Sequence, residues 1–94
     1  MLPSIKRALD SLGENIKLAR LRRRISMRLL AARSGVSAST LCRIEAGNGT
    51  VSINSYTKVL HSLGLISCIE KLALDDELGR KLQDIELLNG ADNE

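Results

Sequence analysis

Aromatic residues are nearly absent from this 94-residue chain, which has no Trp, no Phe and a single Tyr, Tyr56. Proteins that hold single-stranded nucleic acid usually stack its bases on aromatic rings, so this function is disfavoured. A core without rings consists of Leu, Ile, Val and Ala, which favours short packed helices. A chain of this length forms one small domain of marginal stability, and we expect a partner subunit to contribute to it.

Reactive and metal-binding residues are also scarce. Cys42 and Cys68 stand alone without a CxxC pair, and His61 is the only histidine, so a zinc site would lack ligands. With no Gly-rich phosphate loop and no Ser/His/Asp set, we expect a protein that is not an enzyme and has no cofactor, metal or small-molecule substrate. Cys42 is better explained as a small half-buried filler than as a redox switch.

Long apolar runs are missing too. No stretch approaches the length of a membrane span, and the first residues lack the apolar segment of a signal peptide. We therefore expect a cytoplasmic protein with reduced thiols and no membrane partner.

Charge is present but unevenly distributed. Residues 1–47 hold ten Lys/Arg and three Asp/Glu, a net +7, whereas residues 48–94 hold four Lys/Arg and eight Asp/Glu, a net −4. A basic half suits a polyanion, and the lack of aromatic residues points to duplex DNA held by its phosphates.

Apolar residues recur every three or four positions in most of the chain, which predicts an all-α fold. Ser4 can cap a first helix that breaks near Gly13, and a second helix runs from Glu14 to Arg24. Alternatively, Gly13 only kinks the two into one another.

Two short helices joined by a glycine-containing turn come next. Ser26 caps the first, which Gly35 closes in the left-handed conformation, and Ser37 caps the second, which ends at Gly47. These are the parts of a helix-turn-helix, whose second helix enters the major groove of DNA. The outward residues of that second helix are Ala38, Ser39 and Arg43, of which the arginine can reach a guanine edge or a phosphate.

The chain then continues with a helix capped by Ser52 and stopped by Gly64. Residues 65–74 fit either a helix or a strand, and they hold more apolar residues than a small bundle needs. We expect this region to bury against a second subunit. The predicted dimer interface consists of Leu65, Ile66, Ile69 and Leu72.

The span from about Gly13 to Leu65 resembles the Cro/C1-type (XRE) helix-turn-helix family in the motifs I-K-L-A-R, L-A-A-R-S-G-V-S and T-L-C-R-I-E-A-G. The resemblance implies a five-helix, lambda-repressor-like bundle that binds a pseudo-palindromic operator in double-stranded DNA as a homodimer. We expect the DNA-binding domain at residues 13–65. An N-terminal helical extension would occupy residues 1–12, and a C-terminal dimerisation and partner-binding extension residues 66–94.

The resemblance also implies roles for individual residues. Glu45 resembles the glutamate of the recognition helix, which pairs with the arginine that falls here at Arg20 and so orients nearby phosphate contacts. The implied base-reading residues are Ser37, Ala38, Ser39, Thr40 and Arg43. The implied phosphate-contacting residues are Arg24, Ser26, Met27, Arg28, Asn48, Gly49 and Thr50.

Three positions depart from the pattern of the family. Met27 and Ala38 stand where many members carry glutamine, and Arg24 stands where glycine is common. The missing glutamines weaken direct readout, so specificity would depend on Arg43, on Ser39 or on DNA shape.

A narrower resemblance rests on G-E-N-I-K-L-A-R-L-R-R-R-I-S, S-x-S-T-L-x-R-I-E-x-G and L-G-R-K-L-Q-D. These segments are similar to HipB-type antitoxins encoded beside HipA-like serine/threonine kinase toxins, which implies a repressor of its own operon that also docks a kinase toxin. Two alternatives remain open. One is a general or phage-type regulator without a toxin, and the other is an interaction module that inhibits a partner enzyme and binds DNA weakly.

Overall fold

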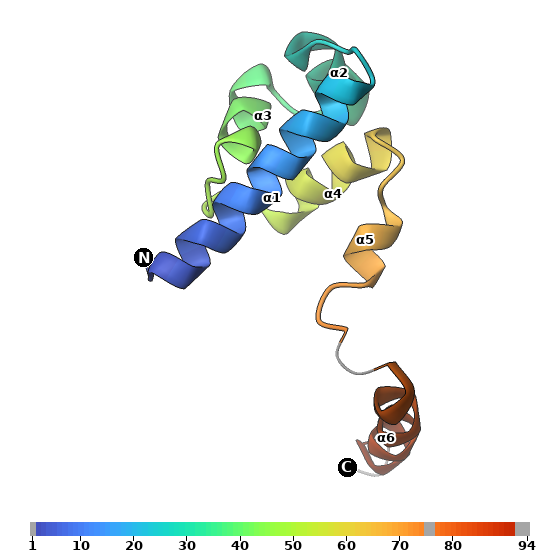
Figure 1. The fold of residues 1–94 in the computed structure, drawn as a ribbon. Coiled ribbons are helices and arrows are strands. Elements are labelled where there is room, and N and C mark those ends of the chain that lie inside the picture. The colour runs from blue at the N-terminus through green and yellow to red at the C-terminus, as the bar shows by residue number, and fades with distance from the viewer. Residues whose placement is uncertain (1, 75–76, 92–94) are drawn as a thin grey trace.

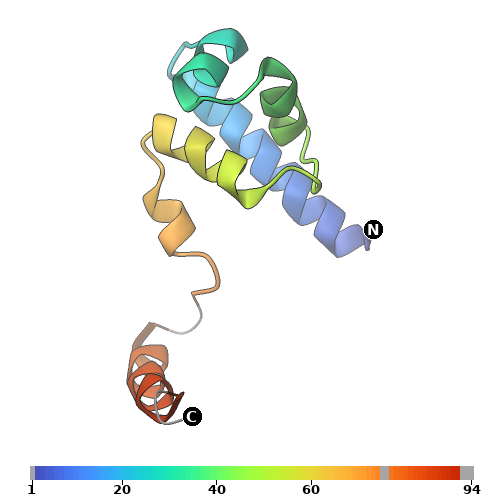
Figure 2. The same cartoon turned by 180° about the vertical axis from the view of Figure 1, so that it is seen from behind.

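The computed structural model describes residues 2–74 and 77–91, and every regular element in these two ranges is an α-helix. The all-α prediction is therefore confirmed. In chain order the helices are α1 (Pro3–Arg22), α2 (Met27–Ser34), α3 (Ala38–Glu45), α4 (Ile53–Ser62), α5 (Ser67–Glu70) and α6 (Glu77–Ala91). Helices α1 to α4 pack into a bundle, α5 follows α4 at its edge, and α6 lies apart in two opposite views (Figures 1 and 2).

The first helix differs from the prediction, because α1 is continuous over 20 residues and the expected break near Gly13 is wrong. Its N-cap residue is Leu2 rather than Ser4. Gly13 lies inside the helix, where α1 crosses the end of α3. A Cβ atom at this position would be 2.7 Å from the carbonyl oxygens of Ile44 and Glu45. Of the N-terminal helical extension expected at residues 1–12, residues 3–12 form the first turns of α1, and residue 1 lies outside the described residues.

The caps of α2 and α3 are formed as predicted. The Ser26 hydroxyl accepts a hydrogen bond from the Leu29 N–H at 3.1 Å, and the Ser37 hydroxyl accepts one from the Thr40 N–H at 3.0 Å. Gly35, between the two helices, has a φ of 70°, which lies in the left-handed region that glycine adopts most readily. The turn and the start of α3 are therefore fixed by local hydrogen bonds.

The core is aliphatic except for one ring. The buried residues of α2, α3 and α4 recur at intervals of one to four positions, as expected for helices that each bury one face. The buried apolar residues are Ile16, Ala19, Leu30, Ala31, Leu41, Ile44, Tyr56, Val59, Leu60 and Leu63. The single aromatic ring belongs to Tyr56, and its hydroxyl donates to the Asn48 carbonyl at 2.9 Å. Tyr56 thereby connects the core to the loop that follows α3.

The ambiguous region after Gly64 contains the short helix α5, flanked by turns, so the helical alternative holds. Gly64 ends the preceding segment with a φ of 77°, as the predicted stop requires. Residues 75–76 and 92–94 of the expected C-terminal extension lie outside the described residues.

Candidate nucleic-acid interface

The candidate recognition helix, α3, buries one face and exposes the other. Leu41 and Ile44 are fully buried in the core, which fixes the rotation of the helix about its axis. The exposed residues of α3 are Ala38, Ser39, Cys42 and Arg43. The short side chains at the first two of these positions let another surface come close to the backbone at the N-terminal end of the helix.

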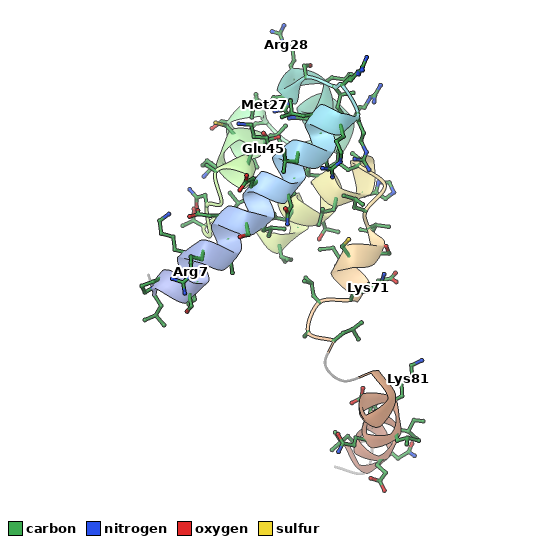
Figure 3. All side chains as sticks on the ribbon, in the orientation of Figure 1. Arg7, Met27, Arg28, Glu45, Lys71 and Lys81 are labelled. Carbon is green, nitrogen blue, oxygen red and sulfur yellow. The ribbon has the colours of Figure 1, made fainter. Side chains whose placement is uncertain are left out.

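A buried ion pair holds the C-terminal end of α3 against α1. The Arg20 Nε atom is 2.7 Å from Glu45 Oε2, and its Nη2 atom is 3.1 Å from Oε1, so the contact is bidentate. A third hydrogen bond runs from Arg20 Nη1 to the Ile25 carbonyl at 3.1 Å. Hydrogen bonding to Glu45 raises the pKa of the Arg20 guanidinium above its ordinary value, despite the opposing effect of burial. Figure 3 shows Glu45 where α3 meets α1.

Two glycines let the helices approach closely enough for this pair to form. Gly13 of α1 lies against the last carbonyls of α3, and Gly47, just beyond α3, has a φ of 76°. A Cβ atom on Gly47 would be 2.7 Å from the Leu9 carbonyl oxygen. The first half of α1 therefore supports the candidate recognition helix directly.

The N-terminal end of α3 carries a chain of side-chain hydrogen bonds. The Ser37 hydroxyl donates to the Thr40 hydroxyl at 2.9 Å, and Arg43 Nη2 approaches the same oxygen at 3.4 Å. Thr40 is half-buried, and its hydroxyl oxygen accepts a hydrogen bond from each of these two side chains. Of the five residues proposed to read bases, these three are linked to one another, whereas Ala38 and Ser39 are exposed beside them.

The N-terminus of α2 is the second part of the surface. Met27 and Arg28 occupy the first turn, where backbone N–H groups have no acceptor within the helix and favour an anion. The Met27 side chain is half-buried against the core, whereas Arg28 points away from the bundle (Figure 3). A phosphate at this end would meet the N–H groups and the Arg28 guanidinium rather than the Met27 side chain.

Arg24 precedes α2 and has a φ of 55°, in the left-handed region that disfavours side chains with a Cβ atom. This conformation explains physically why glycine suits the position. The Arg24 side chain is exposed and adds a positive charge next to Ser26.

The loop after α3 is stiffened by its own hydrogen bonds. Asn48 Oδ1 accepts from the Thr50 N–H at 2.7 Å and from the Thr50 hydroxyl at 2.6 Å, while the Asn48 N–H donates to the Arg43 carbonyl at 3.0 Å. Gly49 and Thr50 are exposed and Asn48 is half-buried. The Asn48 carbonyl also accepts from Tyr56, which ties the loop to α4, and the hydrogen bonds described leave the Asn48 amide NH₂ available as a donor.

The four residues predicted for the dimer interface do not share one surface. Leu65, Ile69 and Leu72 line an apolar groove of about 280 Å³ between α1, α4 and α5. Ile66 instead lies in a different hollow, beside Lys58 and His61.

Some features were not identified from the sequence. The Ser34 hydroxyl donates to the Ser62 hydroxyl at 3.0 Å and so connects α2 to α4. The available signal was the position of Ser34, three residues after Ala31 on the buried stripe of α2. The interpretation of Cys42 as a half-buried filler is wrong, because its thiol is exposed beside the N-terminus of α2.

Comparison with known proteins agrees with this geometry. The family model described as helix-turn-helix matches residues 16–70, which is more than half of the chain and includes α2 to α5. The chain belongs to the Cro/C1-type helix-turn-helix family. It is accordingly a DNA-binding regulator. No curated protein and no solved structure matches the chain.

Two kinds of feature are absent from the described part of the chain. None of its helices is long and apolar enough to cross a membrane. Within residues 2–74 and 77–91, no three His, Cys, Asp or Glu side chains lie together in a way that could hold a metal ion.

Proposed function

We propose that this helix-turn-helix protein is a sequence-specific transcriptional repressor that binds a pseudo-palindromic operator as a homodimer. In this arrangement, the α3 helices of the two subunits enter successive major grooves about 34 Å apart. The observation that carries the proposal is the exposed face of α3, whose orientation is fixed at one end by the Ser37 cap and at the other by the Arg20–Glu45 pair. A rigid, small-residue face is what a helix needs to approach base edges closely.

The proposal divides the surface into base-reading and phosphate-binding residues. Arg43 is the one long donor on the exposed face of α3, and it would read a guanine, with Ser39 beside it. Phosphates would bind at the first turn of α2, with Arg28 and Arg24, and at the loop of Asn48, Gly49 and Thr50. Since the Met27 side chain is half-buried against the core and carries no amide, the position that carries glutamine in many relatives would contribute its backbone N–H.

The test is a fluorescence-anisotropy titration of the protein against its own upstream DNA and a scrambled duplex, at two salt concentrations. We expect a preference of at least about 10³-fold for the upstream DNA. Arg43→Ala should reduce that preference at one base pair. Arg28→Ala should weaken binding to both duplexes alike and lower the salt slope by about one.

Lys71→Ala is the matched control, since it removes one exposed positive charge from the α5 side of the molecule, away from α2 and α3 (Figure 3). It should leave both affinities nearly unchanged. Equal loss on the two duplexes for Arg43→Ala would refute its role in base reading. Equal affinity of the unchanged protein for both duplexes would refute sequence-specific repression.

The biological setting that we propose is a cytoplasmic antitoxin, without enzymatic activity, that represses its own operon and neutralises a HipA-like serine/threonine kinase. Its support is the similarity of residues 13–26, 37–47 and 78–84 to HipB-type antitoxins. The test is co-expression with the product of the adjacent gene. Co-purification and relief of growth arrest would support this role, and a neighbouring gene that encodes no kinase would favour a general or phage-type regulator instead.

A second candidate function is a protein-interaction inhibitor that binds DNA only weakly. It is favoured by the two missing glutamines, at Met27 and Ala38, because both remove side chains that contact DNA in many relatives. Stable capture of the adjacent gene product without any gel shift on the upstream DNA would support it.

A further inference from the structure

An apolar groove lies on the side of the bundle formed by α1, α4 and α5. Its walls are mainly aliphatic, and several wall residues remain open to solvent: Leu12 is 36% exposed, Ile53 64% and Leu72 60%. An open apolar surface of this kind marks an interaction site in a small protein. The groove plays no part in the proposed contacts with DNA.

Helix α6 presents an unpartnered apolar stripe. Leu82, Ile85 and Leu88 follow one another at intervals of three residues and so share one side of the helix. Each of them is at least 61% exposed. A solitary helix of 15 residues is marginal in water unless an apolar face is buried against another surface. Both the groove and the stripe therefore lack a partner within one copy of the described structure.

We propose that α6 of one copy seats its Leu82, Ile85 and Leu88 stripe in the groove of a second copy, and that the exchange is reciprocal. This exchange rests on the homodimer of the proposed function and identifies the segment that joins its two subunits. It brings Leu65, Ile69 and Leu72 into the interface as the floor and rim of the groove, while Ile66 stays outside it.

The segment between α5 and α6 favours exchange over closure within one chain. The described part of this segment is residues 71–74, and Leu72 in it lines the groove. Ala73 follows with a φ of 65°, a strained conformation for a residue with a Cβ atom. A short strained hinge promotes exchange of the helix that follows it between copies.

The area available is sufficient for a dimer. Each large aliphatic side chain covers roughly 60 to 100 Å² when it leaves water, as its transfer free energy implies. Three such side chains on α6 and three on the groove, counted for both copies, give on the order of 1,000 Å², which is about the minimum expected of a biological interface.

Disulfide trapping tests the arrangement, because Cys68 lies exposed in the groove and supplies one of the two thiols. In a full-length Cys42→Ser background, Ile85→Cys places the second thiol on the stripe of α6. Oxidation should convert most of the chain into a covalent dimer on a non-reducing gel. Gln83→Cys, on the other side of α6, is the matched control and should give little dimer.

Other outcomes would overturn the proposal. An Ile85→Cys monomer whose two thiols are lost to an internal disulfide would show that α6 covers the groove of its own chain. Absence of any disulfide, or equal dimer yields for the two variants, would show that the stripe does not seat there.

Sedimentation gives an independent measurement. Leu82→Glu with Leu88→Glu should convert the dimer to a folded monomer, whereas Gln83→Glu should leave it dimeric, and an unchanged dimer in the first variant would contradict the exchange. Neither measurement involves DNA. A protein that binds its operator specifically but fails both tests would refute the exchange alone, and a trapped dimer without sequence preference would refute only the repressor function.

Discussion

The Arg20–Glu45 ion pair offers the sharpest test of how the recognition helix is held. Its two side chains are only 9% and 5% exposed, and the Nε–Oε2 distance is 2.7 Å. Glu45→Ala would leave the Arg20 guanidinium buried, with the Ile25 carbonyl as its one remaining partner in the described hydrogen-bond set. A buried charge that loses its counterion is strongly destabilising, because water no longer solvates it and the protein no longer neutralises it.

The expected loss of stability in Glu45→Ala follows from the burial of the ion pair. Removing one member of a buried pair costs about 3–5 kcal/mol, a large part of the roughly 5–15 kcal/mol that stabilises a typical small protein. The chain also contains the matched control. Lys6 and Asp10 form an ion pair at the same distance, 2.7 Å, but with side chains 66% and 47% exposed. Asp10→Ala should therefore change the free energy of unfolding by no more than about 0.5 kcal/mol.

Urea denaturation followed by circular dichroism measures both variants and the double replacement of Arg20 by Met and Glu45 by Leu. The double variant should recover most of the stability that Glu45→Ala loses, because no uncompensated charge stays buried. The reasoning would be refuted if Glu45→Ala and Asp10→Ala lost similar amounts, since burial would then not determine the strength of the pair.

Three further predictions concern the backbone and the one tyrosine. Arg24→Gly should raise the free energy of unfolding by about 1 kcal/mol, because glycine adopts the left-handed φ of 55° without strain. Loss of a phosphate contact by the side chain should also lower the salt slope of DNA binding. An unchanged urea midpoint would contradict the claim that Arg24 is strained. Gly13→Ala should lower the free energy of unfolding, measured by urea denaturation, by about 1–3 kcal/mol, because its Cβ would clash with two α3 carbonyls although alanine favours helix. Gly90→Ala, which has open space around it, should not destabilise the fold. Burial raises the pKa of Tyr56 above its ordinary value of 10.0, so the unfolded chain loses this proton first and the stability of the fold should decrease as pH rises above about 10. Tyr56→Phe should lack this part of the pH dependence. Equal pH profiles of stability for the two proteins would contradict this prediction.

Local features of the fold were predictable from the sequence. The caps at Ser26, Ser37 and Ser52 and the left-handed Gly35 depend on a few neighbouring residues, so the pattern sufficed. The buried positions of α2, α3 and α4 followed from helical periodicity for the same reason.

Features that depend on tertiary contacts were not predictable in this way. Gly13 looked like a helix break because its role, the close crossing of α1 and α3, involves residues more than thirty positions away. The partners Arg20 and Glu45 came from the family resemblance and not from periodicity, although an arginine four residues after Ile16 on a buried stripe was a visible anomaly. Residues 65–74 stayed ambiguous because α5 is only four residues long and shows no period.

The way α1 supports α3 separates the residues that hold the recognition helix from those that would read DNA. Gly13, Ile16 and Arg20 lie along one buried stripe of α1, and the first and last of them contact the C-terminal end of α3. The exposed Ser39 and the Ser37–Thr40 hydrogen bond lie toward the opposite end, and the Arg43 guanidinium reaches back from the last turn of α3 to Thr40. Substitutions on the α1 stripe should therefore reduce stability and lower affinity for all sequences together, whereas substitutions near the N-terminus of α3 should change which sequence is preferred. Such a division lets the reading residues vary in size and polarity without disturbing the core.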